Sequence, residues 1–232
     1  MRRFVFSLSV IALIAGFIAT PPASAQQSVN FYVGAFSPRS LDGRGTHDVL
    51  FQNLDFATFD VNNFNGPTVG GEWLVGLGDR FDAGIGVGFY QRTSPAVFTQ
   101  FVNLDQSDIE FDQKLRVVPI TATIRFLPLG HRGPVRPYIG GGVGILSWRY
   151  SESGSFVDFQ NNNNIFRDTF TASGTKAGPV ILAGVTFPMG NVGIGGEIRY
   201  QSAKADLTSD WPVGTTVDLG GMNYLFMVNV RF

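Results

Sequence analysis

The chain has 232 residues, of which 44% are hydrophobic, and its formal net charge is −1 at pH 7. This composition excludes a polar disordered chain, which could not bury enough apolar surface to fold. The sequence has no cysteine and no basic excess. A disulfide framework and Cys-ligated zinc are therefore excluded, and nothing in the charge balance favours nucleic-acid binding.

The first 25 residues have the three parts of a secretory signal peptide. Two arginines at positions 2–3 precede an apolar run from Phe4 to Ala19, and the small-residue motif ASA at 23–25 follows. The run is shorter than the ~20 residues that a membrane-spanning helix needs. We therefore expect export with cleavage after Ala25, and one mature domain over residues 26–232.

After the signal peptide, eight segments alternate apolar residues with polar residues or glycine. A period of two residues indicates β-strands. In chain order the segments are SVNFYVGAF, TVGGEWLVGL, FDAGIGVGFYQ, VVPITATIRF, VRPYIGGGVGI, GPVILAGVTF, NVGIGGEIRYQ and GMNYLFMVNVRF. Pro119 lies in the fourth segment, and because proline cannot donate to a strand ladder, we expect a bulge or a lost hydrogen bond there.

Short and long connections alternate between these segments. The short connections are residues 78–80, 127–134 and 188–190, and the long ones are roughly 37–67, 93–113, 151–175 and 202–215. Tight turns at one end and long polar loops at the other are typical of outer-membrane barrels. We predict an all-β fold, namely an eight-stranded antiparallel up-and-down transmembrane β-barrel. Ten strands stay open as an alternative, because LFQNLDFATFDV in the first long connection could form extra strands.

The two faces of the predicted strands differ in charge. One face is almost free of charged residues, whereas the other carries glycines and five ionisable residues, Glu72, Arg125, Glu197, Arg199 and Arg231. An Arg or Lys that faced lipid would cost about 2–4 kcal/mol at mid-membrane, so we expect the uncharged face to point outward. A secreted soluble barrel, with its apolar face inward, is the disfavoured alternative.

The five ionisable residues would then line a narrow lumen, where charges must be paired. We predict that Glu72 and Glu197 form salt bridges with several of the arginines. This polar network would fill and rigidify the barrel, or alternatively line a narrow pore. Four phenylalanines on the apolar face lie beside short turns or the C-terminus, which predicts an aromatic girdle at the periplasmic interface: Phe81, Phe126, Phe187 and Phe232.

The last segment ends in Phe232, and aromatic or β-branched residues precede it at alternate positions: Tyr224, Phe226, Val228 and Val230. This pattern resembles the C-terminal signal that outer-membrane proteins present to the barrel-assembly machinery. The turn LGDRF and the segments RPYIGGGVGI and NYLFMVNVRF are similar to those of the OmpA-like outer-membrane barrel family, over residues 28–232.

This resemblance implies a location in the bacterial outer membrane, contact with its lipid and lipopolysaccharide, and assembly through the last strand. The sequence departs from the larger family members because no peptidoglycan-binding domain follows the barrel. We therefore do not expect a role in tethering the cell wall.

The sequence predicts no enzyme, cofactor or metal site. The glycines at 84–88 and 140–144 lie inside predicted strands and not before a helix, which disfavours a dinucleotide site. The only histidines, His47 and His131, fall on opposite sides of the membrane in this topology and could not share a site. The acidic residues of the long loops read as solvated carboxylates.

We therefore expect a non-enzymatic outer-membrane protein with a structural or surface-interaction role through its four long loops, whose partner the sequence does not identify. A pore for small solutes is the alternative. An outer-membrane enzyme is disfavoured because no catalytic constellation is found.

Overall fold

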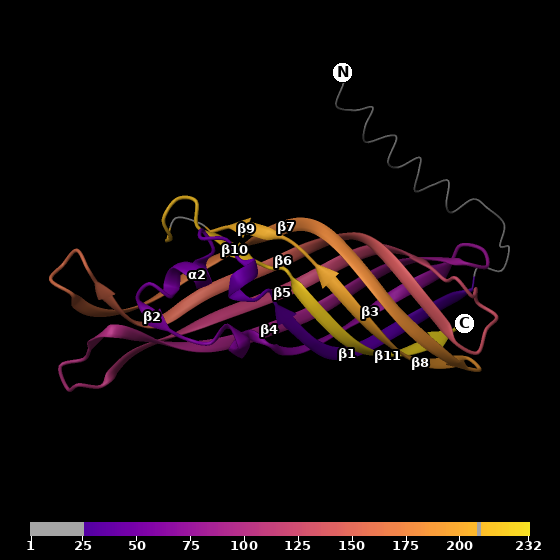
Figure 1. Ribbon diagram of the computed structural model, residues 1–232, viewed down its shortest axis with the longest axis horizontal. Coiled ribbons are helices and arrows are strands. Elements are labelled where there is room, and N and C mark those ends of the chain that lie inside the picture. The colour runs from indigo at the N-terminus through magenta and orange to yellow at the C-terminus, as the bar shows by residue number, and fades with distance from the viewer. Residues whose placement is uncertain (1–25, 208–209) are drawn as a thin grey trace, which may run out of the picture.

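A computed structural model describes residues 26–207 and 210–232, so the predicted signal peptide lies outside the described residues. Figure 1 shows an elongated barrel with the C-terminus at one end and two long hairpins projecting from the other. No helix in the described part of the chain is long and apolar enough to cross a membrane.

Eight strands form the wall of the barrel. They are β1 (Gln27–Pro38), β3 (Gly66–Gly76), β4 (Phe81–Val102), β5 (Asp108–Phe126), β6 (Arg136–Asp158), β7 (Asn164–Met189), β8 (Val192–Gln201) and β11 (Gly221–Arg231). Each pairs antiparallel with its neighbours, and the pairing of β1 with β11 closes the ring. The predicted eight-stranded antiparallel barrel is thus confirmed, and closure lets the wall satisfy its own backbone hydrogen bonds.

Pro119 interrupts the pairing of β4 with β5, as the sequence predicts. Val87 pairs with Ile120 and Tyr90 with Val117, but no pairs form between these two. The register is the same on both sides of the gap, so the proline removes ladder contacts locally and makes no bulge. The irregularity in this strand pair lies farther along, between Val97 and Val102.

Two of the four predicted long loops are wrong. Residues 93–113 and 151–175 lie mainly in strands, because β4 and β5 continue to a short turn at 103–107, and β6 and β7 to one at 159–163. These extensions are the two hairpins that project in Figure 1.

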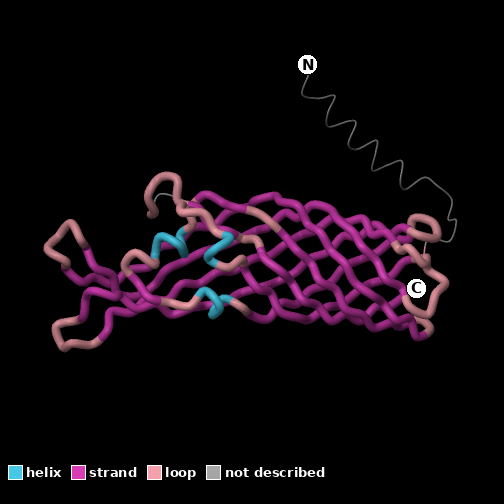
Figure 2. The backbone as a smooth tube through the Cα atoms, viewed as in Figure 1, coloured by secondary structure: helices cyan, strands magenta, loops and turns pink. Residues whose placement is uncertain are grey.

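The other two long connections are loops that fold over the same end of the barrel. The first contains η1 (Leu41–Gly43), α2 (Val49–Asn53), β2 (Ala57–Thr58) and η2 (Val61–Phe64), and the last contains β9 (Lys204–Asp206) and β10 (Thr216–Asp218). The ten-stranded alternative is wrong, because β2 has two residues and pairs only with β4. Figure 2 shows the short helices gathered at the hairpin end.

The apolar face of the wall reverses part-way along the strands. On β5, Ile124 points outward and is 56% exposed, whereas Val117 points inward and is 1% exposed. On β6, Ile145 is likewise exposed and Trp148 buried. The half near the short turns therefore has an apolar outside, here called the apolar belt, with these exposed members: Trp73, Ile85, Val87, Phe89, Ile120, Ile124, Ile139, Val143, Ile145, Ile181, Ile198, Tyr224 and Phe226.

The belt confirms the predicted outward orientation of the uncharged face, since a soluble barrel would bury these residues. Beyond the belt the wall follows the soluble pattern, with apolar residues inside and polar residues outside. This reversal explains why residues 93–113 and 151–175 were predicted as loops although they lie mainly in strands. Ile109, Phe111 and Leu115 are buried on the inner face of β5, and they alternate with polar residues in the opposite phase to the belt.

Candidate functional site

Four charged side chains meet inside the half of the barrel that the belt surrounds. Glu72 comes from β3, Arg125 from β5, and Glu197 and Arg199 from β8. They are called the lumen ion-pair network here, and each is almost completely buried. Strand alternation points all four inward, and two carboxylates face two guanidinium groups, so their charges balance.

Arg125 lies at the centre of this network. Its Nη2 atom donates to a carboxylate oxygen of Glu72 and, at 2.8 Å, to Oε2 of Glu197. Arg199 donates from Nε to Oε1 of Glu197 at 2.8 Å, and its Nη2 lies 3.5 Å from Oε2 of Glu72. Charges so deeply buried are tolerated only when they are paired and hydrogen-bonded, as they are here.

Two tyrosines and a threonine complete the network, namely Tyr32, Tyr138 and Thr123. The guanidinium carbon of Arg199 lies 5.5 Å from the ring centroid of Tyr32. The hydroxyl of Tyr138 donates to Oε2 of Glu197 at 2.9 Å, and Thr123 donates to Oε1 of Glu72 at 3.1 Å. The Arg125 guanidinium lies 4.6 Å from the ring centroid of Tyr138, in cation–π distance. Space is tight, because a Cβ atom at Gly84 would lie 2.8 Å from Oε1 of Glu72. Glycine on this face makes room for the network.

Arg231 does not join the other four predicted lumen residues. It lies one residue before the C-terminus, is partly exposed, and donates from Nε to Oδ1 of Asn229 at 3.2 Å. Strand alternation placed Arg231 on the correct face, but its height along the barrel keeps it away from Glu72 and Glu197.

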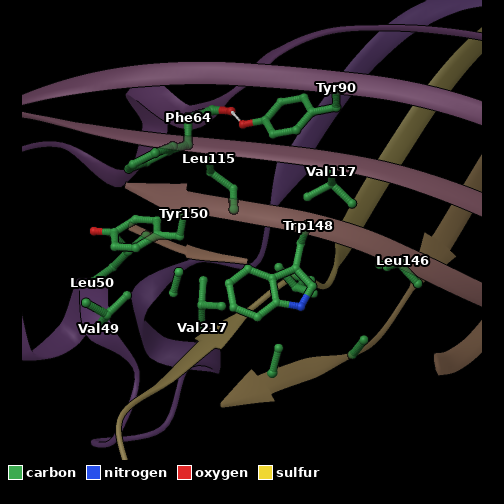
Figure 3. Packing of buried hydrophobic residues seen from close by; sticks show 14 of the residues in the cluster. Val49, Leu50, Phe64, Tyr90, Leu115, Val117, Leu146, Trp148, Tyr150 and Val217 are labelled. Atoms are coloured by element: carbon green, nitrogen blue, oxygen red, sulfur yellow. Dashed lines mark hydrogen bonds between the residues drawn. The ribbon is translucent and has the colours of Figure 1, made fainter. Parts of the chain in front are cut away.

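A second, apolar filling occupies the interior beyond the belt. This interior cluster combines wall residues with residues of the loop that folds in, as Figure 3 shows. The wall contributes Leu115, Trp148 and Tyr150, while Leu50 of α2 and Phe64 of η2 pack against them. The Tyr90 hydroxyl donates to the backbone carbonyl of Phe64, which fixes the loop to β4.

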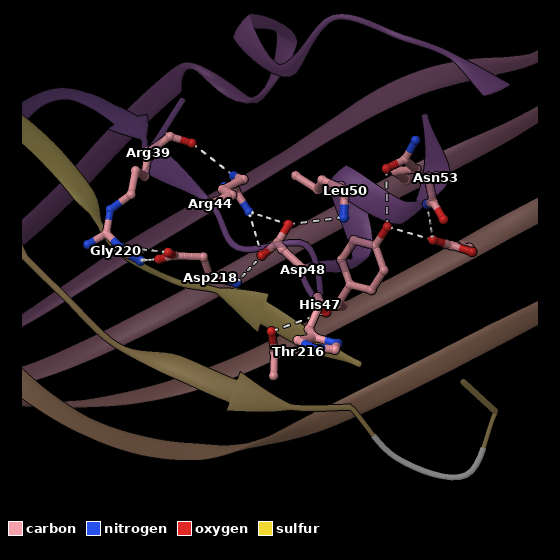
Figure 4. Close-up of polar contacts among 12 residues, drawn as sticks. Arg39, Arg44, His47, Asp48, Leu50, Asn53, Thr216, Asp218 and Gly220 are labelled. Atoms are coloured by element: carbon pink, nitrogen blue, oxygen red, sulfur yellow. Dashed lines mark hydrogen bonds and ion pairs between the residues drawn. The ribbon is translucent and has the colours of Figure 1, made fainter. Parts of the chain in front are cut away.

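A buried polar contact holds that loop in place (Figure 4). Asp48, the residue before α2, accepts hydrogen bonds from the backbone N–H of Leu50 at 3.1 Å and from Nη1 of Arg44 at 3.0 Å. Its second oxygen accepts from the backbone N–H of Asp218 at 2.7 Å, and Asp218 in turn pairs with Arg39 at 2.8 Å. One carboxylate thus joins the first loop to the last.

The remaining predicted residues lie on the outer surface. Tyr224, Phe226 and Val230 are exposed on β11, Val228 is half-buried there, and Phe232, which follows the strand, is exposed. At the short-turn end the rings of Phe81 and Phe126 lie 5.3 Å apart, and Phe187 is exposed. Their roles in assembly and in an aromatic girdle stay predictions.

The histidines lie at opposite ends of the barrel. The carbonyl of His47 accepts from the backbone N–H of Thr216 at the hairpin end, whereas His131 contacts Oδ1 of Asp82 at 2.7 Å beside the short turns. The hydrogen bond to Asp82 raises the pKa of His131 above its usual value. Within the described residues, no group of three or more His, Cys, Asp or Glu is placed to hold a metal ion.

Solved outer-membrane barrels resemble this structure. OprG of Pseudomonas aeruginosa superposes with a TM-score of 0.54 at 13% identity, covering 90% of this chain and 96% of OprG. Neisserial surface protein A gives a TM-score of 0.47 at 16% identity over 91% of this chain and all of that one. Outer membrane protein W of E. coli gives 0.39 at 15% identity over 91% of this chain and all of that one.

No protein-family model and no curated protein sequence matches the chain. The likeness to OprG concerns the fold. The chain therefore has the fold of the eight-stranded outer-membrane β-barrels.

Proposed function

We propose that the protein is a non-enzymatic barrel of the bacterial outer membrane with a closed interior. Its two projecting hairpins would form the surface that contacts partners outside the cell. The apolar belt supports the location, because a lipid-facing surface explains why so many large apolar residues point outward. Washing isolated membranes with carbonate tests the proposed location. The protein should stay in the membrane and need detergent for extraction, and release by the wash would contradict the proposed location.

The closed interior is supported by one observation: two separate sets of side chains fill the two halves of the barrel. The lumen ion-pair network fills the belt half, and the interior cluster fills the half beyond it. In the network, two carboxylates and two guanidinium groups neutralise one another, so no net charge is left to attract a passing ion. A solute would need to pass both levels in series. This favours a filled barrel over the alternative of a small-solute pore.

The hairpins support a surface role. Their turns stand clear of the barrel, and the space between them is an open depression of about 870 Å³. It is lined by amide, hydroxyl and carboxylate side chains together with two apolar ones: Asn103, Leu104, Asp105, Ser107, Asn161, Asn162, Asn163, Asn164 and Ile165. Such a surface can form many hydrogen bonds with a partner and is accessible from outside.

Single-channel recording of the refolded mature chain in planar bilayers tests the closed interior. We expect no stable conductance step. Regular conductance steps would contradict the closed barrel and favour the small-solute pore. Insertion is checked in the same preparation by the shift in gel mobility between unheated and heated protein.

A further inference from the structure

Three basic residues form a cluster on the outside of the barrel. Lys114 and Arg116 lie on β5 and Arg149 lies on β6, and all three are exposed. Arg116 pairs in register with Arg149, so their side chains are direct neighbours on one face of the sheet. We call these three residues the basic patch.

The basic patch borders a shallow depression of about 260 Å³. Its other lining residues are Gln91, Ser151 and Thr171, whose amide and hydroxyl groups can donate hydrogen bonds. Gln91 is the register partner of Arg116 on β4, and Ser151 is that of Lys114 on β6. Cations and neutral donors thus converge from neighbouring strands.

The patch lies at the edge of the apolar belt. On β4 the outward residue before Gln91 is Phe89, which is exposed, and on β5 the outward residue next to Arg116 is Val118. Successive outward residues are roughly 7 Å apart along a strand. The basic patch therefore occupies the level at which the outside of the wall changes from apolar to polar.

Within the described residues, no carboxylate is in ion-pair contact with the patch. Among the residues that the structure describes, Lys114, Arg116 and Arg149 take part in no ion pair, although the exposed Lys176 pairs with Asp206. Like charges directly opposite each other destabilise a sheet. The arrangement therefore gains stability when an anion binds from outside the chain.

We propose that the basic patch binds the phosphorylated headgroup of a lipid in the outer leaflet, with the acyl chains of that lipid lying along the apolar belt. A guanidinium group can bind phosphate with two parallel N–H···O hydrogen bonds, and a lysine ammonium group adds a point charge. A phosphorylated glycolipid of the lipopolysaccharide class fits, because sugar hydroxyls and amides can pair with Gln91, Ser151 and Thr171. This inference rests on the proposed location in the outer membrane.

Nanodiscs of phosphatidylcholine that contain bisphosphorylated lipid A test the proposal. Native mass spectrometry of the inserted protein counts the lipid A molecules retained by each barrel. The triple variant K114Q/R116Q/R149Q should retain lipid A more weakly by on the order of a hundredfold, given the contribution of each of the three basic residues beside an anionic membrane surface. The control R80Q/R132Q/R167Q makes the same change in charge at exposed arginines elsewhere and should match the wild type.

Three results would overturn the headgroup site. They are unchanged retention by the triple variant, equal retention of dephosphorylated lipid A by the wild type, and binding of an acyl-free glucosamine bisphosphate as tight as that of lipid A. Arg149→Gln alone leaves β5 unaltered, and it should weaken retention in the same direction if the triple variant folds poorly. Insertion into nanodiscs without selective retention contradicts only the lipid site, whereas failure of the wild type to insert contradicts the proposed location as well.

Discussion

Arg125 of β5 and Glu197 of β8 lie 2.8 Å apart, although β6 and β7 separate their strands in the wall. The contact therefore crosses the interior and does not follow the ladder. Because Arg125 also binds Glu72 of β3, a single guanidinium group connects three strands that are not neighbours. Such contacts connect distant parts of the wall through the interior.

Replacing Arg125 with methionine should destabilise the barrel strongly. The change leaves Glu72 and Glu197 buried with only Arg199 to balance them, and breaking a buried ion pair typically costs about 3–5 kcal/mol. The measurement is urea unfolding of the refolded protein in lipid vesicles. Arg231→Met is the control, because Arg231 lies outside the network, and equal midpoints for the two variants would contradict the role of the network.

The two fillings should act as barriers in series. A variant that opens only the network, E72A/R125A, should not conduct ions, and neither should L50A/W148A, which opens only the interior cluster. The combined variant should show stable steps in planar bilayers. Each partial variant serves as the control for the other, and conductance by either one would show that a single level closes the barrel.

Asp48 should hold the first loop against the barrel end. Asp48→Ala removes a helix cap worth about 1 kcal/mol and leaves the buried Arg44 without its carboxylate. We expect limited proteolysis to cut within residues 39–65 much faster, while the wall stays intact. Asp60→Ala is the matched control, because Asp60 caps η2 from an exposed position and holds only Asn62. Identical cleavage rates in the two variants would contradict the anchoring role.

His131 should make the short-turn end less stable as the pH rises. Its pKa in the folded protein is raised by Asp82, so the stabilisation is complete below the pKa of the unfolded chain, about 6.5. The stabilisation is lost as the pH rises through the folded pKa. The difference in unfolding free energy between the wild type and His131→Gln should therefore shrink from pH 6 to pH 9. We expect at most about 1 kcal/mol, because the pair is partly solvated, and a difference that is independent of pH would rule out this pair as its source.

The sequence was sufficient to predict the strands of the apolar belt, because a lipid-facing wall imposes one strict alternation. It was not sufficient beyond the belt. Residues 108–117 alternate as regularly as 118–126, but in the opposite phase, so a search for one continuous apolar face ends the strand at the reversal. The acidic residues of the hairpins, such as Glu110 and Asp112, added to the impression of loops.

For the interior, the alternation of the strands predicts on which face each charged residue lies, but it does not predict the position of that residue along the barrel axis. Glu197 and Arg231 share the inward side, yet only Glu197 reaches the network. Tyr32 and Tyr138 were missed, although both lie on the glycine-bearing side of their strands, where an aromatic residue is unusual. The role of Asp48 in joining the two loops could not be recognised, because its partner in the last loop, Asp218, lies 170 residues away in the sequence.

The level at which the wall reverses also sets a hydrophobic thickness. From Val118 to Phe126, β5 rises about 27 Å at ~3.4 Å per residue. A strand tilt of about 40° reduces this to about 21 Å along the membrane normal, close to the ~25 Å apolar band of outer-membrane barrels. The protein is therefore matched to a thin bilayer, and in thicker membranes it would have to thin the lipid around it at an energetic cost for every ångström of mismatch.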